Sequence, residues 1–296
     1  MQQHLVTISV GIILGVLARL YMLRIDYRQY PSYPHGFVTH LSLGFIAAAL
    51  GAVAVPAIAK PDYTAVTFLA LAAQQFREVR NIERETLSRL DQMELVPRGF
   101  DYIEGIARVF EARNYLVMAT ALGTSLATYF LGWVPGVVTG IILILFFGRL
   151  MRGEWVRDIA EVVPGQVHFD GAFLKVNQIV IMNVGLPAFR EKILKEGLGV
   201  VLKPKDDNAR ATLNTVGQRQ AILHVAAALL GSKKEIGEPE FNPLARKDID
   251  TGEIAIFLLP NEPDIECLVE AVGRVPVLES AKRMPLSTRV SRSAAD

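Results

Sequence analysis

The stretch that decides the fold is residues 115–150, which read YLVMATALGTSLATYFLGWVPGVVTGIILILFFGRL. Two apolar runs, 115–131 and 134–150, flank Trp133 and Pro135 and hold no charged residue before Arg149. Each run is long enough for a helix that crosses a bilayer. Turn residues and a tryptophan at the junction are typical of a helical hairpin whose turn lies at the membrane surface. The stretch therefore predicts two antiparallel membrane spans.

Three further apolar runs precede this pair, at residues 5–23, 37–59 and 63–76. The first is not typical of a cleaved signal peptide, because no basic residue precedes it and no small-residue cleavage site follows it. The third has only 14 residues, about 21 Å of helix, so it needs a thinned bilayer, burial among its neighbours, or extension by Gln74-Gln75. Gly11 and Gly15 predict close packing of the first helix on another helix of the same chain. We expect five spans in all.

The arginines predict the orientation of these spans. If all five runs cross, the outer loops carry only Lys60. The inner segments carry twelve arginines, which are Arg19, Arg24, Arg28, Arg77, Arg80, Arg84, Arg89, Arg98, Arg108, Arg113, Arg149 and Arg152. Positive charge gathers on the cytoplasmic side of membrane proteins. We therefore expect the amino terminus outside and the carboxyl terminus in the cytoplasm, with Arg19 extending to the lipid headgroups.

Composition separates the first 153 residues from the rest. The chain of 296 residues is 51% hydrophobic and 21% charged. Residues 1–153 hold 13 of the 31 basic and 10 of the 30 acidic residues, which leaves 18 and 20 for the remainder. Neither part has the basic excess of a nucleic-acid-binding protein. Cys267 is the only cysteine, so it forms no intrachain disulfide, and we expect it to be a small buried residue.

The polar segment between the third and fourth runs, residues 77–113, forms the predicted cytoplasmic loop. Residues 77–90 have the spacing of an amphipathic helix, with Val79, Ile82, Leu87 and Leu90 on one face. We expect this helix to continue the third span as a stalk and to end at Pro97-Arg98-Gly99.

A hexapeptide in this loop combines helix-start and packing signals. It runs Tyr102-Ile103-Glu104-Gly105-Ile106-Ala107 and follows Asp101. Asp101 is predicted to cap a helix that starts at Tyr102, with Glu104 completing a capping box. Gly105 costs about 1 kcal/mol inside a helix, which indicates the close approach of another backbone. The simplest interpretation is a capped helix packed on the stalk. The functional interpretation is a docking surface for the C-terminal domain or a partner protein.

These six residues resemble the motif of the YIEGIA family, multi-pass membrane proteins of endospore-forming bacteria (Firmicutes), and the order of spans agrees along most of the chain. The resemblance implies a role in sporulation at a membrane. It brings no assigned reaction, cofactor or catalytic residue.

Residues 154–283 are predicted to form a cytoplasmic α/β domain, and residues 284–296 a disordered tail. Strands are expected at 176–184, 200–202, 254–259 and 275–278, and helices at 187–198, 206–230 and 263–273. Asn214, Gln218 and Arg219 are predicted on the polar face of the long helix as a candidate recognition surface, and His224 as a partly buried histidine. His168 and Asp170 supply at most two metal ligands and no nucleotide-binding glycine pattern occurs, so no cofactor or metal is expected.

Two functions are compatible with these features. The first is a non-catalytic scaffold or regulator in the cell membrane, or in a spore or forespore membrane, which contacts lipid and protein partners. The second is a membrane-embedded serine hydrolase or protease that uses Ser125 and His40. Gly123-Thr124-Ser125 is similar to part of the rhomboid protease motif, but Leu126 stands where that motif has glycine. His40 is more simply placed at the membrane interface beside Thr39. The sequence does not predict an oligomeric state.

Overall fold

The computed structural model describes residues 4–26, 36–59, 63–76, 78–151, 153–233, 241–288, 290 and 293. The chain divides into two compact units. The helical unit consists of Met1–Leu87 and Ile106–Arg152, and the α/β unit consists of Ser88–Gly105 and Gly153–Asp296. Residues 88–105 of the predicted cytoplasmic loop therefore fold with the C-terminal domain.

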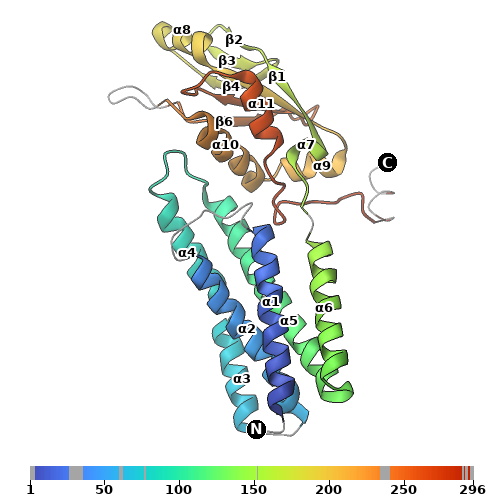
Figure 1. Ribbon diagram of the computed structural model, residues 1–296. Coiled ribbons are helices and arrows are strands. Elements are labelled where there is room, and N and C mark those ends of the chain that lie inside the picture. The colour runs from blue at the N-terminus through green and yellow to red at the C-terminus, as the bar shows by residue number, and fades with distance from the viewer. Residues whose placement is uncertain are drawn as a thin grey trace. The chain divides into compact units, whose positions relative to one another are not determined.

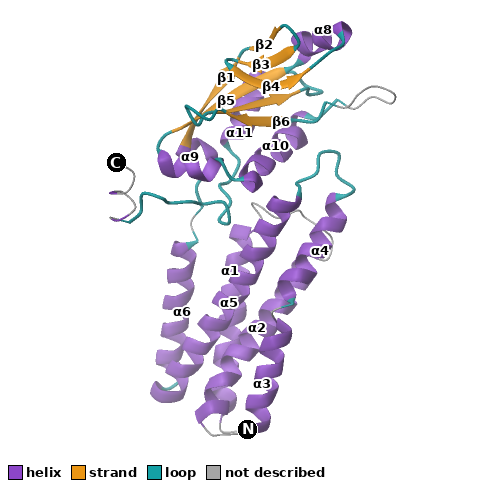
Figure 2. Ribbon diagram, turned by 180° about the vertical axis from the view of Figure 1, so that it is seen from behind, coloured by secondary structure: helices purple, strands orange, loops and turns teal. Residues whose placement is uncertain are grey.

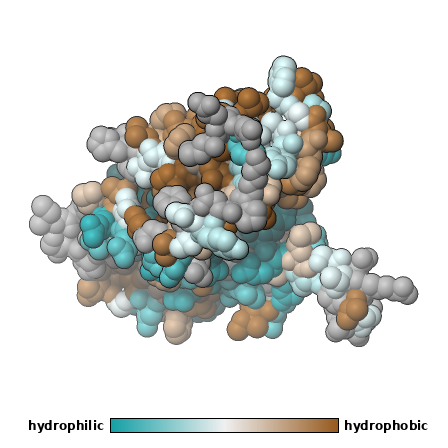
Figure 3. Space-filling view, turned by 90° about the horizontal axis from the view of Figure 1, so that it is seen from below, coloured by the Kyte–Doolittle hydropathy of each residue, from teal (hydrophilic) through white to brown (hydrophobic). Residues whose placement is uncertain are grey.

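The helical unit is built from long helices that run side by side (Figure 1). The described residues from Leu5 to Leu150 form six helices: α1 (Leu5–Asp26), α2 (Gly36–Ala59), α3 (Tyr63–Phe76), α4 (Val79–Asp91), α5 (Phe100–Leu131) and α6 (Trp133–Leu150). Among the described residues, α1, α2 and α6 are long and apolar enough to cross a membrane. Many apolar side chains of α6 are exposed, including Ile142, Leu145 and Phe146, as on a surface that faces lipid. Figure 3, which views the molecule from below, shows both apolar residues (brown) and polar residues (teal) at the surface.

Small residues allow α1 and α2 to pack closely. A Cβ atom added to Gly11 would lie 2.8 Å from the Cβ of Ala52, and one added to Gly15 would lie 2.6 Å from the Cβ of Ala48. Both distances are too short for real carbon atoms, so the two helices can approach this closely only with glycine at these positions. The prediction that Gly11 and Gly15 serve packing within the chain is confirmed.

The predicted helix–turn–helix of residues 115–150 is confirmed, but its first helix begins at Phe100 and, among the described residues, α6 and not α5 is one of the candidate membrane spans. The helix α5 ends at Leu131, Gly132 turns the chain with a φ of 97°, and α6 starts at Trp133. Gly140 of α6 lies so close to Thr124 of α5 that an added Cβ would come within 2.7 Å of the threonine Oγ1. The second half of α5 and α6 are therefore packed antiparallel.

The predicted stalk differs from the structure in two ways. The helix α3 ends at Phe76 and α4 begins at Val79, so the stalk is a separate helix and not a continuation of the third apolar run; Arg77 lies outside the described residues. The buried face of α4 carries Val79, Glu83 and Leu87, whereas Ile82 is 60% exposed. Residues spaced by four lie on one face of a helix. The apolar pattern predicted Ile82 on the buried face, but Glu83 lies there instead.

The α/β unit contains two antiparallel sheets (Figure 2). The four-stranded sheet has the order β1-β5-β7-β6, and the three-stranded sheet has the order β2-β3-β4. The strands are β1 (Ala160–Gly165), β2 (Val167–Asp170), β3 (Phe173–Val176), β4 (Ile179–Asn183), β5 (Leu198–Pro204), β6 (Leu244–Lys247) and β7 (Ile254–Leu258). The helices are α7 (Val156–Ile159), α8 (Pro187–Glu196), α9 (Asp207–Leu213), α10 (Val216–Leu230) and α11 (Ile265–Gly273).

The core of this unit lies on both faces of the four-stranded sheet. Leu174 and Ile181 of the three-stranded sheet pack with Val201 and Phe257 on one face, and α10 and α11 pack against the other. All five residues of β7 are buried. This double burial explains why β7 is a continuous apolar run, which the sequence predicted as a strand.

Several predictions for this unit are wrong in detail. The predicted helix over 206–230 is two helices, because the chain turns at Asn214 and Thr215 between α9 and α10. The predicted strand at 275–278 makes only one isolated bridge, between Pro276 and Trp155. Cys267 is exposed because α11 buries the opposite face, which carries Leu268 and Val272. Strands β1, β2, β3 and β6 were not predicted, because they are short and only partly apolar; only the last residue of β3 lies in the predicted strand over 176–184, which contains β4.

The ends of the helices agree with the predicted signals. The side chain of Asp206 accepts a hydrogen bond from Ala209 N at 2.7 Å and so caps α9. Gly231 ends α10 with a φ of 74°, a conformation that glycine adopts without strain. In the predicted tail, residues 289, 291–292 and 294–296 lie outside the described residues.

Candidate functional site

The hexapeptide lies at the amino end of α5, which begins earlier than predicted. Ile103 N donates a hydrogen bond to Gly99 O at 3.1 Å, so the first helical turn already contains Asp101. Asp101 is therefore inside the helix and is not its cap. The first turn is instead completed from α10, because Gln220 Oε1 accepts a hydrogen bond from Tyr102 N at 3.2 Å. Residues separated by 118 positions form this contact, so local sequence signals could not have predicted it.

Asp91 holds the loop that leads into this helix. Its two carboxylate oxygens accept hydrogen bonds from Arg98 N at 2.7 Å and from Gly99 N at 3.0 Å. The guanidinium of Arg98 lies 3.7 Å from the same carboxylate. Gly99 has a φ of 83°, which glycine adopts without strain. The loop between α4 and α5 is thus closed by one nearly buried carboxylate.

Two glycines bring α10 and the carboxyl-terminal segment against the hexapeptide. A Cβ atom added to Gly217 of α10 would lie 3.1 Å from Asp101 O, so this is where two backbones approach closely. A Cβ added to Gly105 would collide with Ser280 Oγ. The predicted close contact at Gly105 therefore exists, but its neighbour is a side chain rather than a backbone.

All six residues of the hexapeptide are buried. Burial raises the pKa of Tyr102 to about 12, although the nearby Arg98 acts in the opposite direction. Residues up to Gly105 belong to the α/β unit, and Ile106 and Ala107 belong to the helical unit. The boundary between the units therefore falls inside a continuous helix, and the hexapeptide is the segment of α5 that both units share.

The proposed recognition surface on α10 is only partly a surface. Gln218 is completely buried: its Nε2 donates to Pro276 O at 3.2 Å, and its Oε1 accepts from Leu278 N at 2.8 Å. The amide holds the segment that contains Ser280 in place. Asn214 is exposed and Arg219 is half-buried. Gln218 is thus a structural residue, which the helical spacing of polar residues did not reveal.

His224 of the same helix is partly buried and hydrogen-bonded, as predicted. Its Nδ1 lies 2.7 Å from Val96 O in the loop before α5. Burial lowers the pKa of His224, and the hydrogen bond to Val96 partly opposes this shift. The histidine therefore helps to hold the loop on α10. The two side chains considered as metal ligands have structural contacts: Asp170 pairs with Lys175 at 2.6 Å, which lowers the pKa of Asp170, and His168 Nδ1 lies 3.4 Å from Gln166 O.

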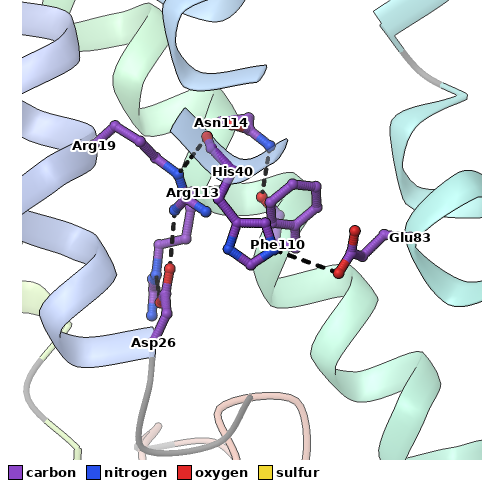
Figure 4. A network of polar contacts seen from close by, with 7 residues as sticks. All are labelled: Arg19, Asp26, His40, Glu83, Phe110, Arg113 and Asn114. Atoms are coloured by element: carbon purple, nitrogen blue, oxygen red, sulfur yellow. Dashed lines mark hydrogen bonds and ion pairs between the residues drawn. The ribbon is translucent and has the colours of Figure 1, made fainter. Parts of the chain in front are cut away.

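A second polar cluster lies inside the helical unit (Figure 4). Asp26 at the end of α1 accepts hydrogen bonds from Arg19 Nη1 and from Arg113 Nε of α5, each at 2.9 Å. The three side chains are almost completely buried. The prediction that Arg19 extends to the lipid headgroups is therefore wrong, because its side of α1 is covered by Gly44 of α2 and by Phe110 of α5.

His40 and Glu83 extend this cluster to α4. His40 Nε2 lies 3.5 Å from Glu83 Oε1, and both side chains are buried. The imidazole stacks on Phe110 with ring centroids 4.7 Å apart, and Arg19 Nε donates to the backbone oxygen of His40 at 3.4 Å. His40 is thus buried rather than interfacial. The cluster connects α1, α2, α4 and α5.

The structure does not bring Ser125 and His40 together. Ser125 Oγ donates a hydrogen bond to Ala52 O at 2.8 Å, a contact that joins α5 to α2. His40 instead contacts Phe110, which lies 15 residues before Ser125 on α5, about 22 Å along a helix. A nucleophile and its base need to be within hydrogen-bond reach. Ser125 and His40 therefore do not form a dyad in this arrangement.

The cluster also explains what the sequence did not predict. Asp26 follows Arg19 by seven residues, which places both on one helix face and is the local signal that was available. Arg113 and Glu83 lie far away in sequence, and both were assigned to the predicted cytoplasmic loop over 77–113. No group of three potential metal ligands occurs among the described residues. The cluster holds charges in place by pairing them.

Comparison with known proteins agrees with the hexapeptide. The family model described as "YIEGIA protein" matches residues 7–288. The chain belongs to this family. The chain is also 47% identical over 285 residues to the "Uncharacterized protein YphB" of Bacillus subtilis (strain 168), with 96% of each chain covered. No solved structure matches the chain.

Proposed function

We propose that this YIEGIA protein is a membrane protein with five spans that holds or regulates partner proteins of sporulation at the cytoplasmic face. The observation that carries the proposal is that Ser88–Gly105 and Gly153–Asp296 fold as one unit. Segments of one folded unit lie on the same side of a bilayer. This supports α5 and α6, which lie between these segments, as a pair of crossing helices.

The orientation rests on charge. With α1, α2 and α3 as three further crossings, twelve arginines lie on the side of the α/β unit and only Lys60 lies on the other. The short helix α3 is about 21 Å long, so it crosses where the bilayer is thin or where neighbouring helices cover it. The amino terminus is then outside, and the α/β unit is cytoplasmic.

The burial of the hexapeptide supports a role in joining the two units rather than in binding a separate partner. Gln220 and Gly217 hold the start of α5 within the α/β unit, and the same helix continues into the helical unit. A partner that binds the α/β unit can therefore act on the membrane part through α5. This arrangement suits a scaffold or regulator better than a hydrolase that needs Ser125 and His40 together.

Topology is tested with reporters fused to the full chain at the amino terminus and after Leu150. We expect an external signal from the first and a cytoplasmic signal from the second. A cytoplasmic amino terminus together with a cytoplasmic α/β unit would contradict five crossings, because an even number of runs would then cross. An external reporter after Leu150 would overturn the cytoplasmic location of the α/β unit.

The biological role is tested in a Bacillus subtilis strain that lacks YphB. We expect fewer heat-resistant spores, normal vegetative growth, and restored spore counts when this chain is expressed. Ser125→Ala separates the two functions at equal protein level: a scaffold with this variant restores sporulation, whereas a serine hydrolase does not. Normal sporulation of the strain without YphB would contradict the proposed role.

A further inference from the structure

The carboxyl ends of α1 and α6 lie at the same end of the helical unit (Figure 1). A Cβ atom added to Gly140 of α6 would lie 2.8 Å from Leu14 Cγ, and one added to Gly148 would lie 3.0 Å from Tyr21 Oη. The two contacts are separated by seven residues on α1 and by eight on α6, so the two helices pack in parallel over about two turns. Both helices are candidate membrane spans.

Each of these helices carries one basic residue in its last turn, Arg24 on α1 and Arg149 on α6. Arg24 follows Tyr21 by three residues and Arg149 follows Gly148 by one, so the two arginines differ in height by about 3 Å. Viewed from the amino ends, Arg24 lies about 60° anticlockwise from Tyr21, and Arg149 lies about 100° clockwise from Gly148. Because Tyr21 and Gly148 face each other, both rotations lead to the same side of the helix pair. The two arginines therefore converge.

The positive charge at this place is not compensated within the protein. Both arginines are exposed, and among the described residues no carboxylate pairs with either of them. Asp26, the acidic residue at the same end of α1, is nearly buried and already pairs with Arg19 and Arg113. The carboxyl end of a helix carries roughly half a negative charge, so two helix ends offset about one of the two positive charges. A net positive charge remains.

The side chains around the two arginines are those of a bilayer surface. Leu145 and Phe146 of α6 are 60% and 58% exposed, so the helix presents apolar groups up to the turn that contains Arg149. Tyr21 is 43% exposed, and tyrosine is enriched where a membrane meets water. Guanidinium groups at this level meet lipid phosphates, which they bind through parallel N–H donors.

We propose that Arg24 and Arg149 together bind the phosphate of one anionic phospholipid, which thereby joins the ends of α1 and α6. The net positive charge favours an anionic headgroup, because a zwitterionic headgroup brings an ammonium group of its own. The inference rests on the membrane location within the proposed function, but on neither its orientation nor its role in sporulation.

Native mass spectrometry of the full chain, released from detergent micelles, tests this site. The probes are phosphatidylglycerol and phosphatidylcholine with the same acyl chains, added in equal amounts. We expect the natural chain to retain one phosphatidylglycerol in preference to phosphatidylcholine. Each arginine near an anionic headgroup contributes about fivefold to binding, so Arg24→Gln and Arg149→Gln should each lower this preference about fivefold, and the double variant about thirtyfold.

The matched control is Arg89→Gln, which removes an exposed arginine from the part of α4 that belongs to the α/β unit. We expect this variant to keep the preference of the natural chain. Equal retention of the two lipids by the natural chain would overturn the proposal, as would a preference that survives in the double variant. If the double variant does not fold, the two single variants decide.

A further arm distinguishes the lipid from free phosphate. We expect excess inorganic phosphate to leave the bound phosphatidylglycerol in place, and displacement would overturn the assignment to a lipid. The binding assay in micelles does not depend on topology. An external reporter after Leu150 would therefore contradict the proposed function and leave this inference standing, whereas loss of lipid preference would do the reverse.

Discussion

Replacing Asp26 with alanine tests the buried charge cluster most directly. The carboxylate accepts hydrogen bonds at 2.9 Å from both Arg19 and Arg113, and the three side chains are 2%, 0% and 3% exposed. Asp26→Ala removes the carboxylate that both buried guanidinium groups share as an acceptor. Breaking a buried ion pair costs about 3–5 kcal/mol, and here two donors lose the same partner. We therefore expect a loss of about 3 kcal/mol or more.

The assay is thermal unfolding of the purified full chain in detergent micelles. A loss of this size lowers the Tm by roughly 10 °C for a protein of this length. Asp170→Ala is the matched control, because it removes the same carboxylate from the exposed pair with Lys175, in which the Asp170 side chain is 67% exposed. We expect that control to cost less than about 1 kcal/mol.

A second variant distinguishes the lost pairing from lost packing. Replacing Arg19, Asp26 and Arg113 together by Met, Leu and Met removes all three charges but retains apolar volume. Such exchanges of buried ion pairs are often close to neutral, so most of the Tm is expected to return. The reasoning is refuted if Asp26→Ala melts within about 2 °C of the natural chain. It is also refuted if the triple variant is no more stable than the single one.

Three further predictions concern the α/β unit. Gly105→Ala places a methyl group against Ser280 Oγ, and we expect this collision to cost about 1–3 kcal/mol, against a gain of about 1 kcal/mol in helix propensity. Ser280→Gly should then restore the free energy of unfolding, measured in urea. If the effects of the two substitutions simply add in a double-mutant cycle, the contact is contradicted. Burial lowers the pKa of His224, so the unfolded chain binds the proton at a higher pH than the folded chain does, and stability should fall as the pH drops below about 6.5. His224→Gln should make this fall less steep. Equal slopes of the free energy of unfolding against pH in the two chains would exclude a contribution from His224. Burial raises the pKa of Tyr102 to about 12, so its contribution to stability is complete below about pH 10 and is lost as the pH rises through the pKa of the folded state. Tyr102→Phe should reduce this loss and remove one phenol that titrates late in the ultraviolet absorbance. An absorbance titration that does not change in this variant would show that Tyr102 is accessible.

The sequence predicted much of the helical unit because the signal is local. Continuous apolar runs and Gly132 place the turn of the hairpin within one or two residues, although α5 begins 15 residues before the predicted run, and Gly11 and Gly15 indicate close packing. The same approach failed on α4, where apolar spacing assigned Ile82 to the buried face. A buried carboxylate such as Glu83 is stable only with a partner, and its partner His40 is on another helix.

The hexapeptide shows the same division between local and distant information. Its letters, together with Asp101 and Gly105, predicted a helix start and a close contact. In the structure the helix begins at Phe100 rather than at the predicted Tyr102. Gln220 supplies the acceptor for Tyr102 N that a local cap would otherwise provide. Gln218, predicted on the surface, is buried and forms hydrogen bonds with the backbone of Pro276 and Leu278.

The amino-acid sequence by itself determined where this chain is apolar, where its helices turn, and in which segments its arginines gather, because each of these properties depends on residues close together in the chain. Only the tertiary structure decided which charges are paired and which surfaces are covered. Arg113 meets Asp26 across 87 residues and Gln220 meets Tyr102 across 118, and such contacts depend on how helices pack rather than on any local pattern. The free energy of burying a charge or a backbone donor depends on that distant partner.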